Sequence, residues 1–560
     1  MTHPVVSLIE PSSSLIRDHH GPFQAPKSKS KSRSQTRSAI ENDDDDEDCL
    51  DQLPHKPKYF KNPWPSYRTA SLHDAYLAYQ LGAAIALPPS KTPGSRKFKR
   101  KRTQSQTQVN ELSYEPEQYE LDDSDEEEDP REEDGSLRAE NSSILPKKIY
   151  VRPELSKIWD DDELEDWRDP PVEVITPTWL SSGTDDSEAA GQSGDAPRER
   201  VTWLGHAGVL VQIPWKDKDG FAGVLFDPIF SYRCSPTQYV GPARYLDPPC
   251  KVAELPDIHI CCISHDHYDH LDYYTIMDLW KYHQTTVHFV VPLGLKQWFT
   301  SSGIPSTRIT ELDWWHETFI SFPSTSPYSD IDPTYPPDEV ENDIRISSET
   351  VHEPSSLNLK IAFTPAQHRS GRGILDHMTT LWGSWCLGVV EPEDQDKVEK
   401  RGMLDWKGFK LYFGGDTGYR YATAPEGDDD AICPAFREIA SHYSPFDLAL
   451  LPLSTGSSLP FLRTMLSLSL DQYTLTSSLH CSPQDSLDIH NIIKSRRTLG
   501  IHWGTFCDAD ESRGTRVDFG RSRRAMGVSG DWNHEVERGD GSNDKGCFVI
   551  GEIGETFVLP

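Results

Sequence analysis

The sequence predicts an α/β domain that begins near residue 198, and two observations support this prediction. Short apolar runs typical of buried strands alternate with helix-like stretches from this point onward. Histidines and aspartates stand directly after several of these apolar runs. Because a rigid sheet usually presents its chemistry in the loops at strand ends, we expect the functional residues of the domain there.

The strands and helices of the domain are expected in alternation along the chain. Apolar runs predict strands at residues 201–204, 209–213, 224–226, 258–261, 361–363, 411–413, 448–453 and 499–501. Helices are expected at residues 71–86, 273–282 and 435–442. The first two strands flank the turn at 205–208, and Asp227 ends the third strand.

The remainder of the chain has the composition of segments that do not fold by themselves. The chain contains 43 prolines, and hydrophobic residues make up only 36% of it. Charged, low-complexity composition predicts disorder for residues 1–57 and for most of residues 91–197. Residues 58–90 are expected to pack on the domain as a short segment. Within the domain at 198–560, proline-rich and acidic composition predicts inserted surface loops near residues 322–356, 391–408 and 424–430.

The charge and the cysteine content argue against several classes of protein. The net charge is −33, from 56 basic and 89 acidic residues, whereas a general nucleic-acid binder needs a basic face. The ten cysteines are scattered without a C-x-x-C pair, as expected for free thiols in a reducing compartment. The first residues lack the pattern of a secretory signal, and no apolar run reaches the ~18 residues of a membrane span. We therefore expect a cytoplasmic protein that is peripheral on internal membranes.

The segment at 262–272 concentrates metal-ligating residue types in one short loop. It reads Cys-Ile-Ser-His-Asp-His-Tyr-Asp-His-Leu-Asp and directly follows a predicted strand. Histidine and carboxylate are good ligands for a borderline-soft ion such as zinc. His265 and His267 can reach one ion, while Asp269 and His270 can reach a second ion. The loop therefore predicts the beginning of two metal sites.

Three later residues stand where a sheet would bring them to such a site. His368 follows the predicted strand at 361–363, and His502 follows the last predicted strand. Asp416 comes after the strand at 411–413 in a glycine-rich turn, where the backbone can approach an ion closely. An ordinary hydrogen-bonding role explains one isolated histidine, but it does not explain this whole set of ligand-type residues.

The loop matches the H-x-H-x-D-H motif of the metallo-β-lactamase superfamily, and the chain resembles that superfamily over about residues 198–520. Further pieces are similar to the N-acyl-phosphatidylethanolamine-hydrolysing phospholipase D family, namely residues 62–65, 203–207, 313–315, 363–368, 381–385, 415–419 and 501–506. The metal loop alone specifies only the superfamily. The Trp-Gly-Ser-Trp run at 382–385 and the His-Trp-Gly-Thr-Phe run at 502–506 are far more specific.

The resemblance implies a fold, a pair of zinc ions and a reaction. The implied fold is an αββα sandwich, in which two sheets pack together with helices outside. One zinc ion would be held by His265, His267 and His368, and the other by Asp269, His270 and His502, with Asp416 bridging the two. The implied reaction is hydrolysis of N-acylphosphatidylethanolamine to N-acylethanolamine and phosphatidic acid, with two metal ions activating water.

Two further residues join Asp416 as catalytic candidates. Asp266 lies between two ligands and acts either as a base or proton relay, or only to orient a ligand. His480 looks like a histidine that the family places beside its substrate, where it would contact the phosphate or protonate the leaving oxygen. A surface or capping role is the alternative for His480. Asp227 and His206 are interpreted as turn residues or as residues that orient a ligand from outside the metal site.

The expected partners are a phospholipid substrate, a membrane surface and a second copy of the chain in a homodimer, and no nucleic acid is expected. Two other functions stay open. One is another hydrolase of the superfamily, such as a lactonase or a soluble phosphodiesterase, and the other is a metal-binding scaffold without catalysis. The apolar segment at 461–470 departs from the animal members of the family, and it fits either a lid above the site or ordinary core packing.

Overall fold

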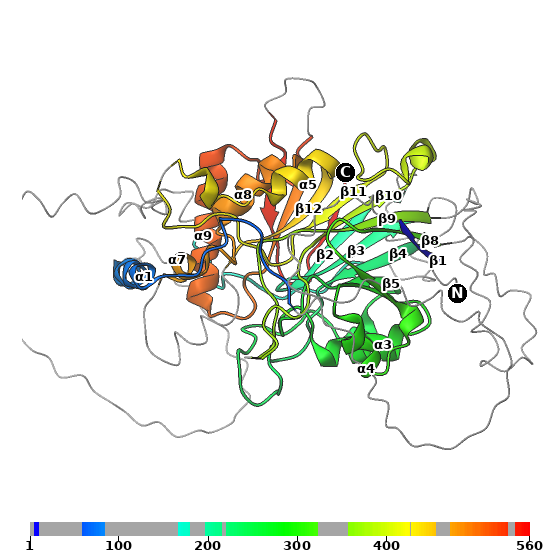
Figure 1. The fold of residues 1–560 in the computed structure, drawn as a ribbon, viewed down its shortest axis with the longest axis horizontal. Helices are drawn as coiled ribbons and strands as arrows, with labels where there is room; N and C mark the ends of the chain where they lie inside the picture. The colour runs from blue at the N-terminus through cyan, green and yellow to red at the C-terminus, as the bar shows by residue number, and fades with distance from the viewer. Residues whose placement is uncertain are drawn as a thin grey trace, which may run out of the picture.

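Two β-sheets form the centre of the molecule, with helices on their outer sides (Figure 1). The computed structural model describes residues 5–9, 59–84, 166–179, 197–215, 220–322, 357–373, 375–425, 427–454, 471–535 and 544–560. The apolar segment at 461–470, expected as a lid or as core, lies outside these residues. So does the loop expected at 322–356, apart from its first residue.

Among the described residues the first sheet has seven strands, and the metal loop follows its interior strand β5. Its order is β15 (Thr556–Val558), β2 (Arg200–Gly205), β3 (Gly208–Pro214), β4 (Phe221–Phe226), β5 (Ile258–Cys262), β6 (His288–Pro292) and β7 (Ile309–Leu312). Strands β4 to β7 run parallel, whereas β15, β2, β3 and β4 pair antiparallel. The parallel part therefore presents the loops after β4 and β5 at one edge.

The second sheet has eight strands. Its order is β1 (Val5–Ile9), β8 (Glu317–Phe322), β9 (Leu357–Thr364), β10 (Ser384–Val389), β11 (Lys410–Phe413), β12 (Phe446–Pro452), β13 (Ser495–Ile501) and β14 (Cys547–Ile550). Strands β11 to β14 run parallel, so the loops after β11 and β13 also meet at one edge. Strands of both sheets bury their facing side chains in a single core, in which Phe226 of β4 stacks on Phe413 of β11 at 4.8 Å between ring centroids.

Helices cover both outer faces and complete the sandwich. The first sheet is covered by α3 (Tyr273–His283) and α4 (Lys296–Ser301), and the second by α5 (Ala435–Tyr443), α8 (Pro483–Ile492) and α9 (Ala509–Met526), as Figure 1 shows. The Asp272 side chain accepts a hydrogen bond from the backbone of Thr275 and so caps α3 at its N-terminus. Ile276 and Leu279 of α3 pack with Phe299 of α4 under the sheet. The predicted αββα sandwich is confirmed.

The structure also contains short helices outside these two layers. The helix expected at 71–86 is observed as α1 (Leu72–Ala84), which contacts α7 (Gln472–Thr476). The described residues also form 3₁₀ turns at η1 (Val252–Glu254), η2 (Ser306–Arg308), η4 (Pro392–Lys397) and η5 (Asp429–Ala431).

Two short segments belong to the fold although they lie in ranges whose composition predicts disorder, for all of residues 1–57 and for most of residues 91–197. Residues 5–9 form β1, which pairs antiparallel with β8 from Val5 opposite Ser321 to Ile9 opposite Glu317. Val172 is buried in the main core, and Val174 bridges to Ile553. The first segment is ordered by backbone pairing with a sheet edge, and the second by burial of Val172 in the core. Such long-range contacts leave no local sequence signal.

The stretch at 391–408, expected as a surface loop, is tied to the second sheet by a buried lysine. The Lys360 ammonium of β9 lies 2.8 Å from the Glu317 carboxylate and donates to the backbone carbonyls of Val398 (2.9 Å) and Lys400 (2.6 Å). Asp394 is fully buried, and its carboxylate accepts hydrogen bonds from the backbone of Lys407 and Gly408. These contacts satisfy buried charges that would otherwise destabilise the fold.

Candidate metal centre

The first group of metal-ligating side chains consists of His265, His267, His368 and Asp416, and all four lie within reach of one ion. His265 and His267 come from the loop after β5, His368 follows β9 and Asp416 follows β11. The Nδ1 atom of His267 is 2.9 Å from Nε2 of His265 and 3.2 Å from Nε2 of His368. The structure therefore brings the three histidines predicted for one ion together with Asp416.

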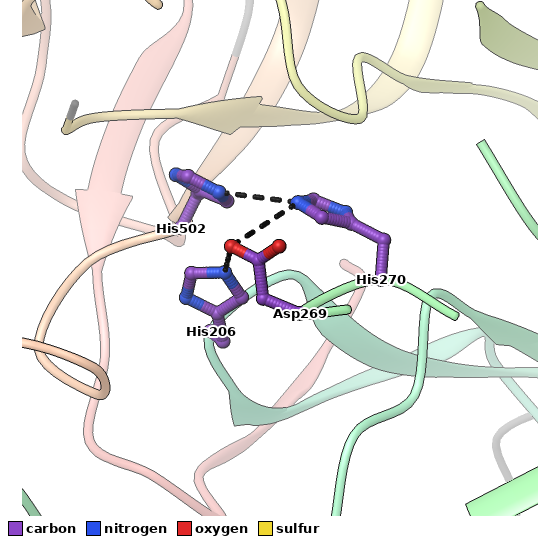
Figure 2. A group of neighbouring side chains, drawn as sticks. All are labelled: His206, Asp269, His270 and His502. Carbon is purple, nitrogen blue, oxygen red and sulfur yellow. Dashed lines mark hydrogen bonds and ion pairs between the residues drawn. The ribbon is translucent and has the colours of Figure 1, made fainter. Parts of the chain in front are cut away.

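The second group consists of His206, Asp269, His270 and His502 (Figure 2). The Nε2 atoms of His270 and His502 face each other at 3.2 Å, although one comes from the loop after β5 and the other from the end of β13. The Asp269 Oδ2 atom lies 3.0 Å from Nε2 of His206 and 4.0 Å from Nε2 of His270. The three residues predicted for the other ion are thus brought together, and His206 joins them.

Asp416 lies between the two groups. Its Oδ2 atom is 3.3 Å from Nε2 of His502, 3.4 Å from Nε2 of His270 and 3.6 Å from Nε2 of His368. One carboxylate oxygen therefore faces nitrogens of both groups, which is the arrangement needed to bridge two ions.

The donor atoms of each group lie close enough together to be shared by one metal ion. Two nitrogens bound tetrahedrally at about 2.0–2.1 Å to one zinc-sized ion lie about 3.3 Å apart. The facing nitrogens are separated by 2.9–3.2 Å within the two groups. Buried imidazole and carboxylate groups are typical ligands of zinc and related ions. The two clusters are consistent with a binuclear metal site.

Residues behind the ligands fix the orientation of their rings. The Nδ1–H of His270 donates to Asp227 Oδ2 at 2.7 Å, and the Nδ1–H of His368 donates to the Leu479 carbonyl at 2.8 Å. Asp227 also accepts a hydrogen bond from the Ser264 backbone at 2.7 Å, and the Ser264 hydroxyl lies 2.9 Å from Nδ1 of His265. Such partners leave the opposite ring nitrogen free to bind an ion.

Burial and neighbouring charges shift the pKa values of these groups in the direction that metal binding requires. Burial lowers the pKa of His265 and His368 well below the ordinary value, so both imidazoles are neutral. Burial alone would raise the pKa of Asp416, but His480 and His502 outweigh it and hold that pKa well below the usual range. His270 differs, because Asp269 and Asp227 outweigh the effect of burial and raise its pKa. An ion would displace that proton.

The two remaining catalytic candidates lie in different surroundings. The Asp266 carboxylate accepts hydrogen bonds from the backbone of Gly371 at 2.7 Å and from the Thr380 hydroxyl at 2.9 Å, so it connects the metal loop to the loop after β9. The Nδ1 atom of His480 lies 3.1 Å from Asp416 Oδ1, and its side chain is 13% exposed. His480 therefore lies at the partly exposed side of the site, whereas the Asp266 carboxylate is directed to the loop after β9.

Sequence reasoning missed Arg372, which supports the metal loop from behind. Its guanidinium donates to the Asp266 carbonyl at 2.6 Å and lies over the rings of Tyr268 (4.6 Å) and Trp298 (5.2 Å). It also donates to the Leu271 carbonyl. Arg372 lies in a polar loop, and its sequence neighbours give no signal of this role.

The fold and the site define a metal-dependent hydrolase of the metallo-β-lactamase fold. A family model described as the Beta-lactamase superfamily domain matches residues 223–503, and the chain belongs to this superfamily. Among the described residues, no helix is long and apolar enough to cross a membrane.

Comparison with individual proteins adds named relatives to this superfamily match. The chain is 30% identical over 312 residues to the N-acyl-phosphatidylethanolamine-hydrolyzing phospholipase D 1 of Caenorhabditis elegans, a match that covers 55% of this chain and 64% of the relative. It is 32% identical over 328 residues to an uncharacterized protein of Mycobacterium tuberculosis (58% and 64% covered). It is 28% identical over 285 residues to the mitochondrial N-acyl-phosphatidylethanolamine-hydrolyzing phospholipase D of Saccharomyces cerevisiae (50% and 44%). The chain thus spans less than two thirds of the length of these relatives.

Proposed function

We propose that the chain is a zinc-dependent phosphodiesterase of the phospholipase D type that hydrolyses N-acylphosphatidylethanolamine to N-acylethanolamine and phosphatidic acid. The observation that carries the proposal is the single oxygen of Asp416 that faces histidine nitrogens of both groups at 3.3–3.6 Å. Two ions that shared this oxygen would suit the in-line displacement at a phosphodiester. The similarity to two relatives named for this reaction supports the choice of substrate.

Different residues of the chain would bind the ions and donate the proton in this reaction. Two zinc ions, when bound, activate water as a nucleophile at neutral pH and neutralise charge on the phosphate. Water attacks phosphorus, the bond from phosphorus to the ethanolamine oxygen breaks, and that oxygen takes up a proton. His480 is placed to donate this proton or to contact the phosphate, since it is the partly exposed histidine beside Asp416.

Exposed side chains close in sequence to a cavity at the metal loop support contact with a lipid surface. A cavity of about 230 Å³ is lined by Ser235, Pro236, Tyr268, Asp272, Tyr273, Tyr274 and Arg372. Close in sequence to its lining residues, Tyr239 is 90% exposed, Val240 70% and Leu375 97%. Because the chain carries a net charge of −33, we propose that its membrane contact is local and hydrophobic and occurs on internal membranes from the cytoplasm.

A substrate comparison tests the proposed reaction. Zinc-loaded protein is given N-acylphosphatidylethanolamine in micelles, a set of lactones and bis-p-nitrophenyl phosphate, and products are quantified by mass spectrometry or absorbance. We expect N-acylethanolamine and phosphatidic acid from the wild type and from His534→Gln, a control at a partly exposed histidine that pairs with Asp544. Hydrolysis of lactones alone would indicate a lactonase, and hydrolysis of none of the substrates would indicate a scaffold.

Two sets of variants test the details of the proposal. His480→Gln should lower kcat roughly 10²-fold while both ions stay bound, because only the proton donor is lost.

The pair Val240→Ser and Leu375→Ser should reduce hydrolysis of lipid in vesicles but leave the rate on bis-p-nitrophenyl phosphate unchanged. Equal activity of this pair on vesicles would contradict the membrane contact.

A further inference from the structure

His206 is buried beside the second group, in the turn between β2 and β3. Its side chain is 2% exposed, and its Nε2 atom lies 3.0 Å from Asp269 Oδ2. Within the part of the chain that the structure describes, this is the one polar contact of its ring, because Nδ1 is buried without a hydrogen-bond partner. Figure 2 shows the ring below the Asp269 carboxylate, on the side away from His270.

The backbone holds His206 in a conformation that a side chain rarely adopts. Its φ is 51°, in the left-handed region. Its N–H donates to the Thr505 hydroxyl at 2.6 Å, and its carbonyl accepts hydrogen bonds from Trp203 Nε1 at 2.8 Å and from the His502 backbone at 2.8 Å. Such a residue persists only where its surroundings fix it, and this happens most often at functional sites.

The neighbours of His206 connect it to His502 of the same group. His502 also has a positive φ, of 58°. The residues next to this pair stack on each other, since the rings of Trp203 and Trp503 are parallel within 11° at a centroid distance of 5.4 Å. The hydrogen bond between the two backbones and this stack make one rigid unit, which places both imidazoles with little freedom.

The unpartnered Nδ1 atom indicates which ring nitrogen of His206 carries the proton. A proton on Nδ1 would leave a buried donor without an acceptor and would turn the lone pair of Nε2 toward a carboxylate. A proton on Nε2 instead makes a hydrogen bond to Asp269 Oδ2 and leaves only a bare acceptor at Nδ1. The second tautomer is favoured, so His206 donates to Asp269.

We propose that His206 is a positioning residue for the second ion and acts through Asp269. The Nε2 atoms of His270 and His502 converge on Asp416 Oδ2 at 3.4 and 3.3 Å, whereas the Nε2 atom of His206 lies 3.0 Å from Asp269 Oδ2. His206 therefore holds the Asp269 carboxylate from outside and fixes the direction in which it binds the ion. This role concerns metal binding and does not depend on the identity of the substrate.

Two substitutions at this position separate the hydrogen bond from the backbone. In His206→Gln the side-chain amide nitrogen takes the place of Nε2 and still donates to Asp269. In His206→Gly no donor remains, but glycine accepts the positive φ without strain. Zinc binding to the full chain is measured by competition with a chromogenic chelator, and the near-ultraviolet circular dichroism of the tryptophans reports whether the fold is retained.

The proposal predicts a loss at one ion only. His206→Gly should bind the second zinc ion 10- to 100-fold more weakly and the first with unchanged affinity, whereas His206→Gln should stay within about threefold of the wild type. Two unchanged affinities in His206→Gly, or an equal loss in both variants, would overturn the proposal, the latter by indicating direct ligation. After Asp269→Asn, a further His206→Gly change should have no added effect, and an additive loss would show that His206 does not act through Asp269.

Discussion

The two metal groups differ in the backbone that carries them. His265, His267 and His368 have ordinary backbone conformations in loops that follow β5 and β9. The second group depends on residues with positive φ, namely His206 (51°), His502 (58°) and, behind His270, Asp227 (37°). Since such conformations cost about 1–3 kcal/mol each, the second group stores strain that the surrounding structure must balance. Two groups with similar residue types can therefore differ in how strongly a substitution weakens metal binding.

The largest effect is expected from the residue that both groups share. Asp416→Asn removes the charge between the groups while keeping the shape of the side chain. We expect both ions to bind weakly and kcat/KM to fall roughly 10³-fold or more, because the paired ions no longer share a ligand. Metal content by mass spectrometry and rates on the lipid substrate check this. Retention of two ions with full activity would remove Asp416 from the bridging position.

Asp227→Asn should weaken both groups, but the second one more. Asp227 binds the ring of His270 directly and reaches His265 only through Ser264. Asparagine tolerates the positive φ, so the change tests the charge and not the backbone. We expect 10- to 100-fold weaker binding of the second ion, with a smaller loss at the first, in zinc titrations. Equal losses at both ions would contradict the difference between the groups.

Ser264→Ala should affect the first group more than the second. The substitution removes the hydroxyl beside Nδ1 of His265 and the hydrogen bond that this hydroxyl donates to Asp227, whereas the hydrogen bond between His270 and Asp227 remains. Loss of the hydrogen bond at His265, worth about 1 kcal/mol, corresponds to a roughly fivefold weaker affinity for the first ion. The same zinc titration measures it, and an equal or larger loss at the second ion would contradict the prediction.

A buried histidine outside both groups gives the reference for histidine burial without metal. Nδ1 of His490 accepts from the Thr498 hydroxyl at 2.7 Å, and its Nε2–H donates to the Lys545 carbonyl at 2.6 Å. Burial lowers its pKa to about 4, below the ordinary value of 6.5, so its stabilisation is complete above pH 6.5 and is lost as the pH falls toward 4. The free energy of unfolding of the wild type and of His490→Gln should differ by about 2 kcal/mol less at pH 5 than at pH 7.5.

Urea unfolding at the two pH values measures this difference, and zinc affinity should be unchanged in His490→Gln. A pH-independent difference would mean that folding does not shift the pKa of His490. A loss of zinc binding would show that the reference residue is not independent of the metal groups.

The grouping of the candidate ligand residues is predictable because these residues follow apolar runs that form strands. His368, Asp416 and His502 follow β9, β11 and β13, and the edge of the sheet brings them together whatever the length of the intervening chain. The resemblance to a known family then assigned them to two ions. The αββα layering was expected from the same source, and the sheets confirm it.

Residues that act through long-range contacts carry no comparable signal in the local sequence. β1 and Val172 are ordered by partners hundreds of residues away, and Arg372 supports the metal loop from an ordinary polar loop. His206 was interpreted as a turn residue or an outer support, but its link to Asp269 depends on how the turn between β2 and β3 meets the end of β13. Hydrogen bonds of this kind follow from the assembled fold and not from local pattern.

The buried lysine under the second sheet constrains how the gene for this protein can change. Lys360 donates to carbonyls of Val398, Lys400 and Gly402, so the inserted stretch supplies most of the partners of a fully buried charge. A deletion that shortens this stretch would leave the ammonium with little besides Glu317, and an unsatisfied buried donor costs about 1–3 kcal/mol. Loss of the insertion is therefore tolerable only together with replacement of Lys360, and the two features are expected to be inherited as one unit.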